Sequence, residues 1–245
     1  MCKIKKIERN FVFSIFILLL IVIFTYALPV INTKIKSNNF LNLIDNSFIS
    51  SILTYQLTTL LLAIVLIGLL FVVKKNSAIK YLSFGIINSK VDPEKYIGLN
   101  PKENENWLHI GINFALIVSI VTGVVLYFQA FKGNNISSEN IKYVPLIFIF
   151  AIMNSFTEEV ITRFSVVVAL DGIISKQKIC IISAFIFGSV HYFGTPGGFL
   201  GVVLAGFLGW LLSKSIIETK GIFWSWLIHC LQDIIIFAGL FYLMI

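Results

Sequence analysis

The sequence predicts an all-α protein, a polytopic membrane helix bundle of about seven (6–8) transmembrane helices. Of the 245 residues, 58% are hydrophobic and only 13% are charged, whereas an average soluble domain is ~25% charged. The mean hydropathy is +0.92. The apolar residues also fall in runs of about twenty, the length that an α-helix needs to cross a ~30 Å hydrocarbon core.

The first half of the chain contains three predicted spans and the longest polar segment. The N-terminal Met-Cys-Lys-Ile-Lys-Lys-Ile-Glu-Arg leads into an apolar run that is too long for a signal-peptide core, so we expect an uncleaved anchor. Residues 74–106 hold six lysines, and Tyr81–Ile87 within them are expected to lie in the membrane interface as a short amphipathic helix. The three spans are expected at about Phe11–Val30, Ile49–Val73 and Trp107–Phe131.

The second half contains four predicted spans separated by short polar loops. The second of these four is short and ends at Gly194-Thr195-Pro196-Gly197-Gly198. In the next one, small residues recur every four positions at Gly197, Gly201, Ala205 and Gly209, which predicts a seam of close helix packing. The expected spans are Val144–Leu170, Ile179–Phe193, Phe199–Ile217 and Ile222–Met244. With no internal repeat, residues 1–245 are expected to form a single integral membrane domain.

The basic residues predict the orientation. With the N-terminus inside, fourteen lysines and arginines lie on the cytoplasmic side and four on the other, and the nineteenth is Arg163 within a span. The positive-inside rule therefore favours a cytoplasmic N-terminus and an outside C-terminus. It also accounts for the net charge of +7 without a nucleic-acid partner. Trp107, Trp224 and Trp226 are expected at the cytoplasmic interface as belt residues.

One stretch, Ser155–Arg163, breaks the apolar pattern with two glutamates and an arginine inside a predicted span. A charged side chain at bilayer depth costs roughly 2.5–3.5 kcal/mol by insertion scales. Glu159 and Arg163 are four residues apart, so they share a helix face and can neutralise each other. Glu158 then lies about 100° round the helix without a local partner.

The remaining polar residues in the late spans fit one layer of the membrane. His229 and Asp233 are four residues apart, so the carboxylate is expected to orient the imidazole. Phe187 is likewise placed to pack on His191. At a rise of ~1.5 Å per residue, Glu158, His191 and His229 all reach the cytoplasmic half or the middle of the core. Any one pair alone serves equally well as helix–helix glue, but three spans converging on one layer favour an intramembrane site.

Three motifs in this region resemble the CAAX prenyl protease and bacteriocin-processing family of intramembrane proteases, called CPBP or Abi. They are Glu158-Glu159-Val160-Ile161-Thr162-Arg163, Phe187-Gly188-Ser189-Val190-His191 and His229-Cys230-Leu231-Gln232-Asp233. The resemblance covers about Val144 to the C-terminus, so residues 143–245 are expected to form the catalytic core. Residues 1–142 are expected to supply N-terminal spans and a cytoplasmic loop.

The resemblance implies an intramembrane endopeptidase that hydrolyses a peptide bond with a glutamate-activated water. Glu158 is expected to be the general base, with Glu159 sharing that role or only pairing with Arg163. His191 and His229 would position the water, the oxyanion or a metal, and Asp233 would orient His229. Arg163 and Phe187 are expected to give structural support.

The resemblance also implies a metal-dependent enzyme. Glu158, His191 and His229 match a minimal zinc shell, although the linear His-Glu-x-x-His signature is absent. The expected substrate is a membrane-associated peptide or protein, and the expected location is a bacterial cell membrane. Two alternatives stay open, a proton-coupled transporter and a non-catalytic membrane scaffold or immunity protein.

Overall fold

The computed structural model describes residues 2–37, 46–128, 132, 138–193 and 197–244, and these residues form a polytopic all-α bundle. Within these ranges, β-structure is limited to two isolated antiparallel β-bridges, Lys90–Asn106 and Glu94–Leu99. The helices are α1 (Cys2–Ser37), α2 (Ser47–Leu82), α3 (Trp107–Leu126), α4 (Val144–Glu159), α5 (Ser165–Leu170), α6 (Lys176–Val190), α7 (Gly198–Thr219) and α8 (Phe223–Met244). Short turns η1 (Lys95–Ile97), η3 (Ser138–Tyr143), η4 (Val160–Phe164) and η5 (His191–Phe193) connect or interrupt them.

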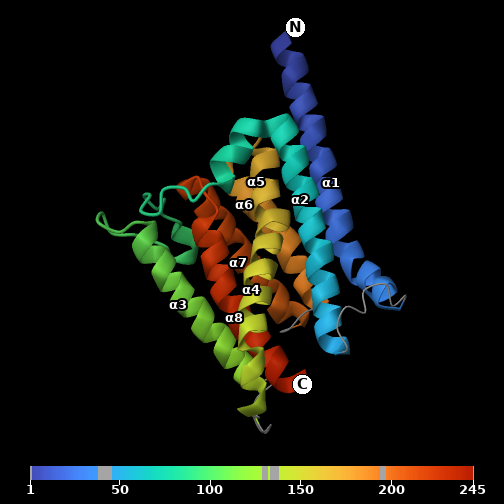
Figure 1. The fold of residues 1–245 in the computed structure, drawn as a ribbon. Helices are drawn as coiled ribbons and strands as arrows, with labels where there is room; N and C mark the ends of the chain where they lie inside the picture. The colour runs from blue at the N-terminus through green and yellow to red at the C-terminus, as the bar shows by residue number, and fades with distance from the viewer. Residues whose placement is uncertain (1, 38–45, 129–131, 133–137, 194–196, 245) are drawn as a thin grey trace.

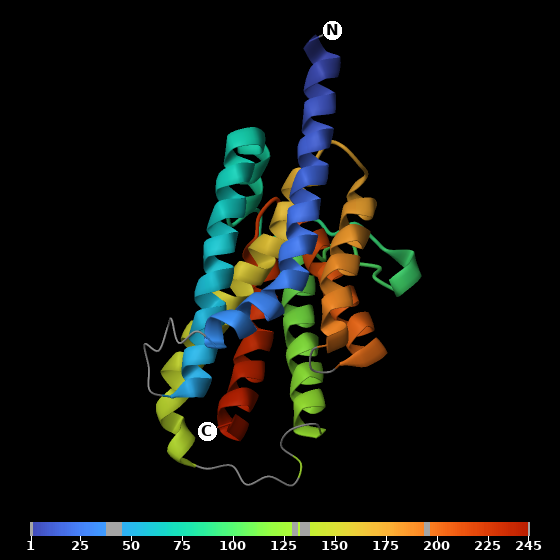
Figure 2. The same cartoon turned by 90° about the vertical axis from the view of Figure 1, so that its right-hand side faces the viewer.

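Within the described residues, six helical stretches are long and apolar enough to cross a membrane, which confirms the predicted class of integral membrane protein. They are Asn10–Leu28, Ser47–Leu82, Trp107–Leu126, Ile141–Leu170, Gly198–Thr219 and Phe223–Tyr242. The remaining predicted span corresponds to α6, which has only 15 residues and packs along α7 as an antiparallel hairpin (Figure 2). The break predicted at residues 194–198 lies partly outside the described residues.

The two chain ends lie at opposite ends of the bundle (Figure 1). α4 and α5 run through its centre and α3 lies at one flank. Which end faces the cytoplasm stays a prediction, because it depends on the distribution of lysines and arginines.

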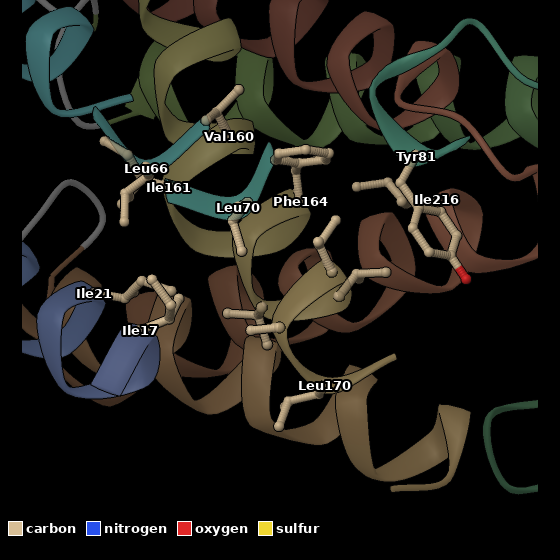
Figure 3. Packing of buried hydrophobic residues seen from close by; sticks show 14 of the residues in the cluster. Ile17, Ile21, Leu66, Leu70, Tyr81, Val160, Ile161, Phe164, Leu170 and Ile216 are labelled. Atoms are coloured by element: carbon tan, nitrogen blue, oxygen red, sulfur yellow. The ribbon is translucent and has the colours of Figure 1, made fainter. Parts of the chain in front are cut away.

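The centre of the bundle is the segment from Val160 to Leu170, in which every residue is buried. Ile17 and Ile21 of α1, Leu66 and Leu70 of α2 and Ile216 of α7 surround it, together with residues of α6 (Figure 3). Its part from Val166 to Leu170 is apolar throughout, and such a helix is buried on all sides. The polar side chains of Arg163 and Ser165 are paired within the bundle.

A π-helical turn, η4, separates α4 from α5. The amide of Ser165 donates to the carbonyl of Val160, five residues back, and the Ser165 hydroxyl donates to the same carbonyl at 2.7 Å. The Thr162 carbonyl accepts from the Ser183 hydroxyl of α6 at 3.0 Å. One extra residue in the turn rotates the following helix by about 100°. Because of this turn, the side of α4 that faces the rest of the bundle is not continued by the same side of α5.

Two sequence expectations near the N-terminal end of the bundle are wrong. Tyr81–Ile87 do not form a separate interfacial helix, because α2 continues past a kink at Lys74 to Leu82 and buries Tyr81. Trp107 and Trp224 are not belt residues, because the segment between α2 and α3 covers them. Their indole nitrogens donate to Glu218 Oε2 and to the Ile87 carbonyl, each at 2.8 Å. A buried tryptophan needs such a partner for its N–H group.

The close seam between α6 and α7 also differs from the expected one. A Cβ atom on Gly188 would lie 2.8 Å from the Val202 carbonyl oxygen, and one on Gly209 would lie 3.1 Å from the Cα of Ala184. Gly209 therefore belongs to the seam as expected and lies against Ala184 of α6, while Gly188 of α6 lies against Val202 and Gly206 of α7. Gly201 and Ala205 instead line a cavity.

Candidate active site

A cavity of about 590 Å³ lies among α2, α3, α4, α7, α8 and the end of α6. The candidate residues Glu158, His191, His229 and Asp233 all line it. Apolar side chains of α3, α7 and α8 form most of the remaining wall: Ile117, Val118, Val121, Val125, Leu126, Leu204, Ala205, Phe207, Leu208, Ile236, Phe237 and Leu240. Leu126 and Leu240 lie near the C-terminal ends of α3 and α8, so the cavity runs from the polar cluster toward the end of the bundle that holds the C-terminus (Figure 1).

Glu159 is the centre of a fully buried network. Its Oε1 atom accepts from Arg163 Nη1 at 2.6 Å and lies 2.7 Å from His229 Nδ1. Its Oε2 atom accepts from the Ser225 hydroxyl of α8. Arg163 also donates to the Thr162 hydroxyl at 3.2 Å, and its guanidinium carbon lies 3.7 Å from the centre of the Phe187 ring. The expected pairing of Glu159 with Arg163 is therefore present.

The partner that orients His229 is Glu159, and not Asp233 as the four-residue spacing suggested. Because an ionised carboxylate only accepts, the contact with Glu159 makes Nδ1 the donor and leaves Nε2 toward the cavity. Asp233 Oδ1 lies 3.7 Å from that Nε2 atom. Spacing within one helix could not reveal the contact with Glu159, because the two residues belong to different helices.

Glu158 faces the cavity, and 23% of its side chain is exposed, whereas Glu159 is completely buried. The Oε2 atom of Glu158 lies 3.6 Å from His229 Nε2. Its Oε1 atom accepts from Asn154 Nδ2 at 3.1 Å. The expectation that Glu158 lacks a local partner is therefore wrong, because Asn154 lies one helical turn before it.

His191 presents one nitrogen to the cavity because the other is held. Its Nδ1 atom lies 2.8 Å from the Phe187 carbonyl oxygen. A carbonyl can only accept, so Nδ1 donates and the neutral ring keeps Nε2 as an acceptor. The Phe187 ring lies 4.3 Å from the imidazole, centre to centre, as the spacing predicted. Phe187 thus contacts both His191 and Arg163 and connects the two parts of the site.

Two amide side chains in the site were missed by the sequence reasoning. Asn154 donates to Glu158 and to Asp233 Oδ2, the latter at 3.0 Å, and Gln56 of α2 donates to Asn154 Oδ1 at 3.1 Å. The available signal was a buried amide in each of two apolar spans, which is expensive unless the amide is paired. The first half of the chain therefore contributes a residue to the site.

His109 lies outside this cluster, exposed beside Asn106 at the start of α3. Cys180 and Cys230 are buried free thiols. Neither thiol contacts the carboxylates or imidazoles in the geometry described above.

The predicted metal ligands have suitable donor atoms, two imidazole nitrogens and a carboxylate. Among the described residues, however, no group of three or more His, Cys, Asp or Glu side chains is arranged to hold a metal ion.

The fold and the cluster together define a membrane-embedded polar site inside an apolar helix bundle. Residues 140–235 match the family model of the Rce1-like type II CAAX prenyl endopeptidases. This match confirms the predicted resemblance to CAAX-type proteases and includes all three motifs. No curated protein and no solved structure matches the chain significantly.

Proposed function

We propose that this chain is an intramembrane endopeptidase that cleaves a membrane-associated peptide or protein with water activated by Glu158. One observation supports this most strongly. The Glu158 carboxylate and His229 Nε2 lie 3.6 Å apart at the wall of an apolar cavity, while a buried carboxylate orients the same imidazole from behind.

Glu158 has the position of a general base. A base must lie within hydrogen-bond reach of the proton that it removes, and Glu158 is the most exposed of the three clustered carboxylates. It takes a proton from water as the water oxygen attacks the carbonyl carbon. The same proton then passes to the leaving amine as the C–N bond breaks, so Glu158 ends the cycle ionised.

His229 is placed to stabilise the oxyanion that forms. With Nδ1 held by Glu159, a protonated ring directs Nε2–H toward the cavity, and Glu159 stabilises the positive charge. His191 presents Nε2 as an acceptor and orients the water. Arg163 neutralises Glu159 and so allows this carboxylate to stay ionised inside the bundle.

The substrate is proposed from the cavity wall. Apolar residues of α3, α7 and α8 form a long wall beyond the polar cluster, which suits a hydrophobic or lipid-modified segment better than a charged one. The prenylated substrates named for the matching family are consistent with such a wall, and so is an unmodified apolar peptide.

The experiment is cleavage of a fluorogenic peptide library by the purified protein in lipid vesicles. The wild type should release fluorescence from peptides with an apolar flank, and Glu158→Gln should not. No cleavage of any peptide by folded wild-type protein would overturn the proposal and favour a scaffold. Dependence of this activity on a divalent metal ion is a separate proposal with its own test. If a divalent ion takes part, a chelator abolishes turnover and added zinc restores it, whereas unchanged turnover rejects the metal.

We propose a cell-membrane location with the N-terminus in the cytoplasm, supported by the distribution of lysines and arginines. Single cysteines in place of Lys75 and Lys142, in a background without the native cysteines, test it. A membrane-impermeant reagent added outside intact cells should label the second and not the first. The reverse pattern would reverse the orientation.

A further inference from the structure

The pair Asn154 and Gln56 lies behind the proposed catalytic carboxylates, and the inference below rests on the proposed function. Both side chains are buried, and both line the cavity. Asn154 belongs to α4, one turn before Glu158, and Gln56 belongs to α2. Neither residue belongs to the three motifs.

The orientation of both amides follows from their neighbours. Asn154 lies within hydrogen-bond distance of Glu158 Oε1 and Asp233 Oδ2, at 3.1 and 3.0 Å. Ionised carboxylates accept only, so the Asn154 nitrogen must face them and its oxygen must face α2. That oxygen accepts from Gln56 Nε2 at 3.1 Å, which fixes Gln56 in turn. A chain of donors thus runs from α2 through α4 to the carboxylates.

We propose that Asn154 is a positioning residue that joins the two carboxylates and fixes Glu158 as the base. Its two N–H groups hold Glu158 Oε1 and Asp233 Oδ2, so the other oxygen of each carboxylate turns toward His229 Nε2. Gln56 holds Asn154 and so connects the orientation of the base to α2. A residue that only holds two helices together needs a contact across them. It does not need to donate to two carboxylates that both lie beside the same imidazole, as Asn154 does.

Kinetics of purified variants on a cleaved peptide provide the first test. Asn154→Leu keeps the number and branching of the heavy atoms but removes both donors. The kcat should fall about 10–100-fold, as for other outer contacts of a catalytic group. KM should change less than about two-fold, because Asn154 acts through Glu158 and not on the substrate. Asn154→Gln retains an amide and should recover part of kcat. Gln56→Leu should show a smaller loss.

Ser155→Ala is the matched control, because it removes a buried hydroxyl one residue away that donates to Ala151 in its own helix at 2.7 Å. Its kcat should equal that of the wild type. A kcat for Asn154→Leu within about three-fold of the wild type would overturn the proposal. So would a loss that merely follows the folded fraction, measured by size exclusion and thermal melting.

A thermal double-mutant cycle tests the same contact without activity. Asn154→Leu leaves two carboxylates without their amide donor and should lower the Tm by about 4–10 °C. Combined with Asp233→Leu, the Tm should exceed the value expected from adding the two single losses. Additive losses of Tm would overturn the proposal that Asn154 joins the two carboxylates. If the wild type cleaves nothing, the proposed function fails, but this cycle still decides whether Asn154 joins the carboxylates.

Discussion

Two clusters of largely buried charge among the described residues differ in how completely their charges are paired. In the first, Lys214 of α7 pairs with Glu218 and lies 3.3 Å from Glu94. Glu218 also accepts from Trp107 Nε1 and from the amide of Asp92. The acidic and basic groups of this cluster contact each other directly, and together they fasten the segment between α2 and α3 to α7.

In the second cluster, two of the three carboxylates do not contact the cation. Glu158, Glu159 and Asp233 lie around Arg163, and only Glu159 forms an ion pair with it. The other two carboxylates face His229 at 3.6 and 3.7 Å along the wall of the apolar cavity. Paired buried charge holds segments together, whereas incompletely paired charge beside a cavity is available for proton transfer.

The largest expected effect comes from the same substitution in both clusters. Glu158→Gln should lower kcat about 10³-fold or more because the amide cannot take a proton, and it should leave the Tm nearly unchanged. Glu218→Gln should lower the Tm and keep the kcat of the folded protein. Peptide cleavage and melting in one detergent measure both. Equal activity of the two variants would remove the distinction between the clusters.

Arg163→Leu should cause the largest loss of stability, about 3–5 kcal/mol, because it leaves Glu159 buried without its cation. Adding Glu159→Leu should restore much of the Tm, since the unpaired charge is then absent. The double variant should keep measurable turnover. This turnover should be slower than that of the wild type, because His229 loses its Nδ1 partner. Thermal melts and cleavage rates test this. A stable but completely inactive double variant would give Glu159 or Arg163 a direct part in the chemistry.

Lys214→Leu extends the comparison to the other cluster. Glu94 and Glu218 would lose their shared cation, so we expect the Tm to fall. The loss should be smaller than that of Arg163→Leu, because Glu94 is partly exposed. Turnover per folded molecule should stay at the wild-type level. Limited proteolysis should show earlier cutting between Ser83 and Asn106 if the cluster fastens this segment. Unchanged proteolysis together with lost activity would contradict the structural role.

The smallest expected effect is that of Asp233→Asn. Its oxygen can still accept from Asn154, so kcat should fall less than about ten-fold. His229→Ala removes the group that faces the oxyanion and should cost about 10²-fold or more. Steady-state kinetics on one peptide rank the two. An asparagine variant as inactive as His229→Ala would assign Asp233 a direct role.

Much of the fold could be predicted because the bilayer constrains each helix separately. The segment Val144–Leu170 was predicted with both of its limits, since about twenty apolar residues must span the core and satisfy their own backbone. Two contacts between residues four apart were predicted as well, although the contact of Asn154 with Glu158 was missed. Glu159 pairs with Arg163 and Phe187 packs on His191 because residues four apart share a helix face.

Contacts between helices depended on the tertiary structure. The pairing of His229 with Glu159 depends on how α4 and α8 are rotated against each other, and packing across the whole bundle sets that rotation. Spacing within α8 pointed to Asp233, and no local pattern placed Gln56 beside Asn154 or buried Trp107 and Trp224. By itself, the sequence determined which residues a helix presents together. The tertiary structure decided which helix they meet, because that depends on side chains distant in the chain.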